Sequence, residues 1–211
     1  MRHHIRALAL AGAAAALTAA LSTGPAATAA VTTPAAAPTF SITPGGAFSF
    51  TGTITLTTSG GVSFTCKVKG TGIFKTGAVQ GNHVGTIKTI TFTDCTGPAG
   101  LSPAATGNAL PWYINFTSYA SGAASGNISG IDVGVSGPGC SAVVDGTSGS
   151  ADNGKTGMKY TNSSAQIGLT KAGGNLHVRD VSGCLGLLDN GEAVTASGTL
   201  KVTPAQTVSS P

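Results

Sequence analysis

Residues 48–57 read Phe-Ser-Phe-Thr-Gly-Thr-Ile-Thr-Leu-Thr, an unbroken alternation of apolar or small residues with hydroxyl side chains. This two-residue period is typical of a β-strand that has one buried face and one solvent-exposed face. Residues 194–203, Val-Thr-Ala-Ser-Gly-Thr-Leu-Lys-Val-Thr, repeat the pattern, and the two segments superpose on Gly52 and Gly198. We predict that these strands lie side by side, because such pairing closes a β-barrel and hides the sheet edges.

Other parts of the chain also have the composition of strands. In the segment that begins at Trp112, we expect Trp112, Ile114 and Phe116 to face the core. No helical period extends over ten residues beyond the first thirty. The sequence therefore predicts an all-β fold, an antiparallel β-barrel or β-sandwich of about nine strands. Besides the two segments above, the strand-like runs are 62–69, 84–94, 110–118, 126–136, 139–146, 158–170 and 174–181, with connections at 97–109 and 145–157.

The four cysteines are arranged in two similar brackets. Each bracket opens in a strand-like run, at Cys66 and Cys140, and closes after one, at Cys95 and Cys184. Four cysteines permit three pairings, and the repeated plan favours Cys66–Cys95 and Cys140–Cys184. We interpret the chain as two diverged halves with one disulfide each. A zinc site is not indicated, because ligands at CxxC-like spacing are absent.

The first thirty residues have the features of a secretory signal peptide. Arg2 and Arg6 precede an Ala/Leu-rich run, and Ala27-Thr28-Ala29 resembles a cleavage site. The apolar run is too short for a membrane anchor. We expect 1–30 to be a signal peptide, 31–39 a disordered Pro/Ala/Thr tether, 40–204 a single secreted β domain and 205–211 a flexible tail. The protein is then secreted and extracellular, with no membrane span after cleavage, and this location suits disulfides.

The charge balance argues against nucleic-acid binding. The chain has 11 Lys and Arg against 7 Asp and Glu, and two of the basic residues lie in the leader. The local excess formed by Lys67, Lys69, Lys75 and Lys88 has no interleaved aromatic residues. We interpret these lysines as the solvated face of two strands, and weak attraction to an anionic cell-wall polymer is the alternative.

Catalytic motifs are weak. Residues 149–156 match the P-loop pattern GxxxxGK[ST], but a strand-like run follows them where a P-loop requires a helix. The chain after the leader contains two histidines, His83 and His177, no GxSxG motif and cysteines expected to be oxidised, so nucleophilic catalysis is not indicated. No cofactor or metal is indicated.

Two aspartates occupy similar places before the closing cysteines, Asp94 and Asp180. We expect their carboxylates to bind backbone amides of the following turns. The alternative is an acidic pair of the kind that hydrolases use. Residues 189–192, Asp-Asn-Gly-Glu, predict a hairpin turn, and a calcium site made together with Asp180 is the alternative there.

The chain resembles small secreted all-β proteins of uncharacterised function from GC-rich Gram-positive (actinobacterial) bacteria. The resemblance covers most of the chain after the leader. It is carried by the opening strand with Cys66, the Asp-Cys-Thr-Gly-Pro segment at 94–98, the Pro111-Trp112 strand, the Gly139-Cys140 opening and the Gly-Thr-Leu-Lys-Val-Thr-Pro segment at 198–204. It implies the fold and an extracellular location, and no activity. A looser likeness, in composition and in two short-range disulfides, is to the apoproteins that carry enediyne antibiotics.

Three functions are consistent with the sequence. The first is a non-catalytic extracellular protein that acts by binding or by surface association, with a cell-wall polymer as a candidate partner. The second is a carrier of an apolar small molecule within the β-structure, with Trp112, Tyr113, Phe50 and Phe64 as candidate contacts, although these aromatics also suit a filled core. The third is a hydrolase that uses an acidic pair.

Overall fold

The computed structural model describes residues 38–147 and 153–211, and in these ranges the chain is all-β, as predicted. The strands are β1 (Thr39–Thr43), β2 (Gly46–Thr58), β3 (Ser63–Phe74), β4 (Gly77–Gln80), β5 (Gly85–Thr96), β6 (Ala104–Asn108), β7 (Trp112–Ala120), β8 (Ala123–Gly137), β9 (Cys140–Asp145), β10 (Gly154–Thr161), β11 (Gln166–Thr170), β12 (His177–Gly183), β13 (Val194–Thr203) and β14 (Thr207–Ser209). Two short 3₁₀ turns, η1 (Pro98–Gly100) and η2 (Cys184–Gly186), follow β5 and β12.

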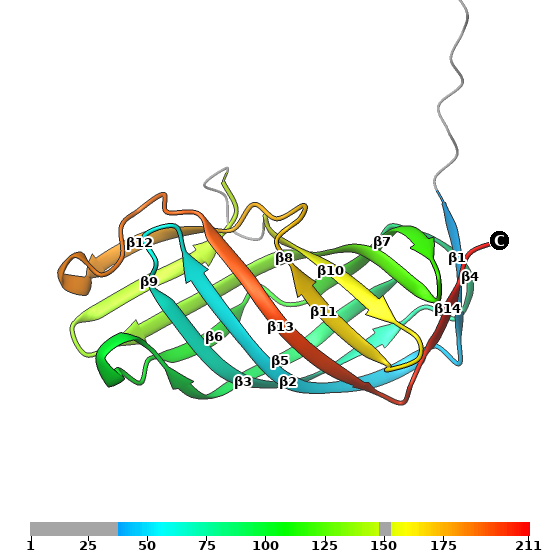
Figure 1. The fold of residues 1–211 in the computed structure, drawn as a ribbon. Coiled ribbons are helices and arrows are strands. Elements are labelled where there is room, and N and C mark those ends of the chain that lie inside the picture. The colour runs from blue at the N-terminus through cyan, green and yellow to red at the C-terminus, as the bar shows by residue number, and fades with distance from the viewer. Residues whose placement is uncertain (1–37, 148–152) are drawn as a thin grey trace, which may run out of the picture. The chain divides into compact units, whose positions relative to one another are not determined.

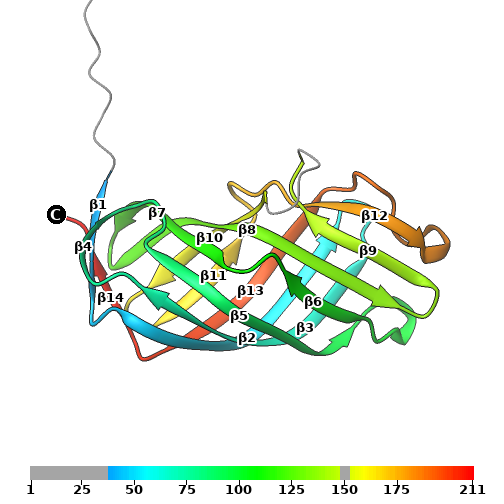
Figure 2. The same ribbon diagram turned by 180° about the vertical axis from the view of Figure 1, so that it is seen from behind.

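Eight strands form a closed antiparallel barrel, which decides between the two predicted architectures (Figures 1 and 2). Their order is β10-β11-β13-β2-β3-β5-β7-β8, and β8 pairs with β10 to complete the ring. The predicted neighbours β2 and β13 pair over ten residues, from Ser49 opposite Thr203 to Thr58 opposite Val194. Their apolar residues face the barrel interior, where Phe48, Phe50, Leu200 and Val202 are buried. The two-residue period is therefore confirmed.

Strand β8 takes part in two sheets. Its first half pairs with β7 and β10 in the barrel wall, whereas its second half pairs with β6 and β9. The change occurs near Gly130, whose φ of 79° is available to glycine at little cost. Strand β12 extends this second sheet by pairing with β9. The barrel is thereby extended at the end where β9 and β12 lie (Figures 1 and 2).

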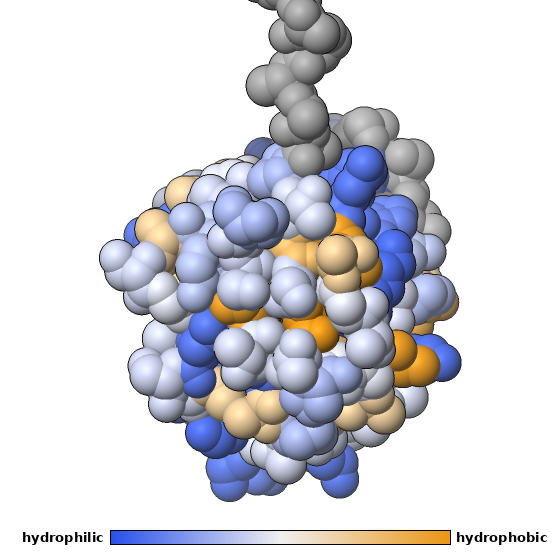
Figure 3. Space-filling view, turned by 90° about the vertical axis from the view of Figure 1, so that its right-hand side faces the viewer, coloured by the Kyte–Doolittle hydropathy of each residue, from blue (hydrophilic) through white to orange (hydrophobic). Residues whose placement is uncertain are grey.

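A separate three-stranded sheet, β14-β1-β4, lies at the opposite end of the barrel (Figure 1). Its apolar residues Phe40, Ile42 and Val208 are fully buried, and the Phe40 ring packs against Phe116 of β7 with centroids 5.4 Å apart. Figure 3 looks onto this end and shows mainly hydrophilic residues at the surface, with small hydrophobic patches between them.

The prediction of a flexible tail at 205–211 is wrong. Strand β14 pairs with β1. The Asn162 side-chain amide donates to the Val208 backbone oxygen at 2.7 Å, and its oxygen accepts from the Val208 backbone N–H at 3.0 Å. Gln206 is 1% exposed, and its backbone donates to and accepts from the Tyr160 hydroxyl. The tail is ordered because it covers the end of the core.

The other boundaries differ in smaller ways. The run 158–170 is two strands, β10 and β11, joined by a turn at 162–165, and the connection 97–109 contains β6. The tether was expected to reach residue 39, but β1 begins at Thr39. The predicted signal peptide and residues 31–37 lie outside the described residues. Strand β10 begins at Gly154, within the P-loop match, and continues to Thr161, so a strand follows the match where a P-loop requires a helix.

Both favoured disulfides are confirmed, and each links neighbouring strands near a β-bulge. Cys66 of β3 bonds Cys95 of β5, and Cys140 of β9 bonds Cys184, which follows β12 directly. In β5, two residues, Asp94 and Cys95, lie opposite the single residue Cys66 of β3. In β12, Asp180 and Val181 lie opposite the single residue Ala142 of β9. The aspartate of each bulge has a positive φ, 49° at Asp94 and 51° at Asp180. The similar placement of these two aspartates thus reflects a shared bulge geometry.

Candidate binding site

The barrel interior is filled by aromatic rings toward one end and contains a small cavity toward the other. Near the β14-β1-β4 sheet, aromatic rings fill the core, with Phe48 stacked on Phe74 at 4.4 Å and Phe74 packed edge-on to Tyr160 at 6.4 Å. Toward the other end the lining becomes mainly aliphatic and an inner cavity of about 50 Å³ remains. Its lining is apolar apart from Thr156, and consists of Phe50, Ile54, Leu56, Ile87, Ile90, Phe92, Trp112, Ile128, Ile131, Val133, Val144, Leu169, Leu176, Ala196 and Leu200.

A narrow middle cavity of about 20 Å³ adjoins the inner one, and the two share Ile54, Leu56 and Phe92. An outer pocket of about 140 Å³ follows, and it shares Phe64 and Pro103 with the middle cavity. The three spaces are therefore neighbours, arranged in a series from the barrel core to the surface. We call this series the apolar channel.

The mouth of the apolar channel is marked by exposed leucines. Leu101, Leu185 and Leu187 line the outer pocket and are 38%, 98% and 40% exposed. The second disulfide also lines the pocket, and its Cys184 and the next residue, Leu185, both have positive φ, 48° and 46°. Such conformations cost about 1–3 kcal/mol per non-glycine residue and are enriched at ligand sites. The chain thus bears backbone strain at the point where it displays its most exposed leucine.

Three of the four predicted contact residues line the apolar channel. Phe50 and Trp112 line the inner cavity, and Phe64 lines the middle and outer ones. Trp112 is the only tryptophan of the chain, and its indole N–H donates to the backbone oxygen of Asn108 at 3.0 Å. Tyr113 is elsewhere, because neighbouring strand residues point to opposite faces. It stacks on His83 at 4.1 Å and borders a different hollow.

The leucines at the mouth are site residues that the sequence reasoning missed. Leu101 lies in a segment interpreted as a connection, and Leu185 and Leu187 belong to the run Cys-Leu-Gly-Leu-Leu at 184–188. Several large apolar residues in a loop, outside any strand period, are unusual for a solvent-exposed connection. That signal could have indicated the mouth.

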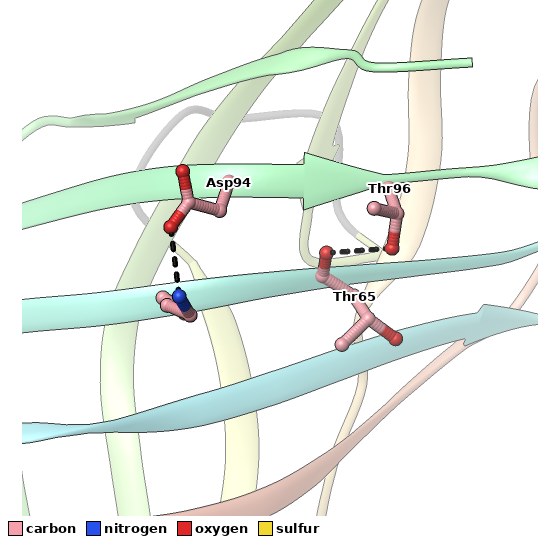
Figure 4. Close-up of polar contacts among 4 residues, drawn as sticks. Thr65, Asp94 and Thr96 are labelled. Atoms are coloured by element: carbon pink, nitrogen blue, oxygen red, sulfur yellow. Dashed lines mark hydrogen bonds and ion pairs between the residues drawn. The ribbon is translucent and has the colours of Figure 1, made fainter. Parts of the chain in front are cut away.

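The acidic pair of the hydrolase hypothesis is not brought together on neighbouring strands, since β5 and β12 are not paired. Asp94 forms an ion pair with Lys67 of β3 at 3.0 Å, next to the bond from the Thr96 hydroxyl to the Thr65 backbone oxygen (Figure 4). Its carboxylate therefore binds a lysine where we expected a turn amide. Asp180 is exposed on β12.

Two other aspartates are buried, and both have structural partners. Asp132 accepts a bond from the Asn108 side-chain amide at 3.0 Å. Asp145 is 3% exposed and accepts backbone N–H bonds from Gly146, Asn153 and Gly154. This arrangement closes the base of the connection between β9 and β10.

Among the described residues, no group of three or more His, Cys, Asp and Glu side chains has the arrangement of a metal site. The same part of the chain contains no helix that is long and apolar enough to span a membrane.

Comparisons with protein-family models, with curated proteins and with solved structures gave no match for this chain. The resemblance to secreted actinobacterial proteins therefore stays a prediction, and the function is inferred from the geometry of the cavities.

Proposed function

We propose that this protein is a non-catalytic extracellular binding protein that carries an elongated apolar molecule in the apolar channel. The observation that supports the proposal is the succession of three apolar cavities, in which each cavity shares lining residues with the next, from the barrel core to the exposed leucines. A predicted signal peptide and two disulfides are compatible with an extracellular location.

The dimensions of the channel favour a thin ligand. A water molecule occupies about 30 Å³ in the liquid, so the inner cavity of about 50 Å³ accepts only a short, narrow group. The outer pocket is larger and is bordered by the exposed leucines, and it suits the bulkier or more polar end of the same molecule. A straight alkyl chain with one polar terminus satisfies both conditions.

The driving force is the transfer of hydrocarbon out of water. Each buried methylene group contributes about 0.8 kcal/mol, which is about a fourfold change in the dissociation constant. The affinity for a homologous series of 1-alkanols should therefore increase about fourfold per carbon atom until the channel is filled, and should then level off.

Trp112 provides a direct test, because the only tryptophan of the chain lines the inner cavity. Its fluorescence should change saturably when the protein is titrated with 1-alkanols of six to twelve carbon atoms. Ala196→Leu fills part of the inner cavity and should weaken binding of the longer alkanols at least tenfold. Ala47→Leu, on the exposed face of β2, adds the same atoms outside the barrel and should leave binding unchanged.

Native mass spectrometry of the protein from its own culture medium gives a second test. Additional mass that disappears on denaturation without reduction would support the proposal and give the mass of the ligand. A bare polypeptide together with unsaturable alkanol titrations would refute it.

A further inference from the structure

A second hollow region lies around Lys155, and none of its lining residues borders the outer pocket of the apolar channel. Its larger part, of about 450 Å³, is bordered by Tyr113, Ser129, Asn153 and Lys155. Its smaller part, of about 180 Å³, is bordered by Lys155, Lys171, Asn175 and His177. Lys155 borders both parts, so they are neighbours, and we call the two together the outer groove. The smaller part also shares Thr156, Leu176 and Ala196 with the lining of the inner cavity.

The outer groove has a positive lining. Its cationic side chains are Lys155 and Lys171, His177 adds an imidazole, and none of the described residues that line either part is an aspartate or glutamate. The buried carboxylate of Asp145, which precedes the connection to β10, accepts bonds from three backbone N–H groups. The remaining polar lining consists of hydroxyl and amide groups, from Ser129, Thr170, Asn175 and Thr195 among others.

The aromatic ring at one end of the outer groove is fixed in position. Tyr113 stacks on His83 with an interplanar angle of 16°. The backbone N–H of His83 donates to the Asn115 side-chain oxygen at 2.9 Å, and the Asn115 amide nitrogen donates to the Ser129 hydroxyl at 2.9 Å. Since Ser129 accepts this bond, its own hydroxyl hydrogen is left to donate to another group.

The rim that carries Lys155 is also fixed. Asp145 accepts the backbone N–H bonds of Asn153 and Gly154, at 3.2 Å and 2.9 Å, immediately before Lys155. Ala109, which also borders the larger part, has a φ of 49°, an unfavourable conformation for a residue other than glycine. A preorganised rim reduces the entropy lost when a ligand binds.

We propose that the outer groove binds an acidic oligosaccharide. The Tyr113 ring offers an apolar platform for the C–H face of a sugar ring, and the hydroxyl and amide groups match sugar hydroxyls. Lys155 and Lys171 would pair with carboxylate or sulfate groups on successive sugars. The groove has one aromatic ring, and its cations are lysines, which lack the planar bidentate geometry of arginine. These features fit a charged sugar chain better than an aromatic base or a peptide.

The test uses calorimetric titration of the full secreted protein with an octamer of galacturonic acid. The fully methyl-esterified octamer has the same sugars without the charge and serves as the neutral counterpart. The acid form should bind with an affinity that falls as salt is added, and the ester should bind at least tenfold more weakly.

Variants separate a defined site from diffuse attraction. Lys155→Gln and Tyr113→Leu should each weaken binding of the acid octamer at least fivefold. Lys88→Gln removes the same charge from an exposed position of β5 and should have little effect. If Lys88→Gln weakens binding as much as Lys155→Gln, or if neither octamer binds, the proposal is overturned. Binding of 1-alkanols by Lys155→Gln should stay at the wild-type level, because this side chain does not line the apolar channel.

Discussion

The ring of Phe50 on β2 lies directly over Gly70 on β3, its partner in the strand register. A methyl group at Gly70 would overlap both the tip of the Phe50 ring and the backbone oxygen of Thr89. Phe48 and Gly72 repeat the arrangement one pair further along the same two strands. Glycine in β3 thus gives the rings of β2 the room they need inside the barrel, which is one reason the aromatic half of the core packs densely.

Gly70→Ala should therefore destabilise the protein. Overpacking a dense core costs about 1–3 kcal/mol, and part of the overlap is with backbone, which moves less readily than a side chain. Gly168→Ala on β11 is the matched control, because its methyl group would meet only the Lys159 oxygen at 3.9 Å. Urea denaturation of both variants checks this expectation. Equal stability of the two variants would contradict it.

Removal of residues 205–211 should lower the free energy of unfolding by about 3 kcal/mol or more. The deletion removes the buried Val208 side chain, whose burial stabilises the folded state by about 1.5–3 kcal/mol. It also leaves the buried Tyr160 hydroxyl without its two partners on Gln206. Deletion of Pro211 alone, which is exposed, is the control. A flexible tail would give no difference between the two truncations in thermal or urea unfolding.

The two disulfides should contribute similarly to stability. They close loops with sequence separations of 29 and 44 residues, and the loop-entropy relation gives about 3–4 kcal/mol for each. Replacement of either pair by serine should lower the free energy of unfolding in urea by this amount. An unchanged unfolding midpoint after replacement would show that the bond does not restrict the unfolded chain.

Stability should decrease at high pH through Tyr160. Burial raises the pKa of this hydroxyl above its usual value of 10.0, and the bond to the Gln206 backbone opposes part of the rise. The unfolded chain then loses the tyrosine proton at a lower pH than the folded chain does. The contribution of the protonated Tyr160 hydroxyl to the free energy of unfolding is therefore complete below about pH 10 and is lost as the pH rises above that value.

Tyr160→Phe isolates this effect. The variant should be less stable at neutral pH, since Gln206 loses its hydroxyl partner. Above about pH 10 its stability should fall less steeply than that of the wild type, by up to about 1.4 kcal/mol per pH unit. Urea unfolding of both proteins between pH 8 and 11 compares the slopes. Parallel slopes would mean that Tyr160 does not titrate differently in the folded and unfolded states.

Local sequence patterns were sufficient for the barrel wall. The alternation at 48–57 and 194–203 gave the buried faces of β2 and β13 and their pairing, and the repeated cysteine plan gave both disulfides. The same alternation assigns Trp112 to the inside and Tyr113 to the outside of β7, so the inclusion of both as contacts of one interior ligand conflicted with the period itself.

Short or isolated elements were not predictable in this way. Strand β14 has three residues and one buried apolar side chain, Val208, which is too little for a period to be recognised. Its position depends on Asn162, 46 residues earlier in the chain. The bulges that place Asp94 and Asp180 in similar conformations also depend on the partner strand.

By itself, the sequence determined the all-β class and the buried faces of β2, β7 and β13, and it favoured the correct one of three cysteine pairings, because a two-residue period and a repeated spacing are local properties. The closure of the barrel, the series of cavities from Trp112 to Leu185 and the outer groove from Tyr113 to Lys171 are set by the tertiary structure. A cavity is the space that side chains from distant segments leave unfilled, and that space is set by how those segments pack together.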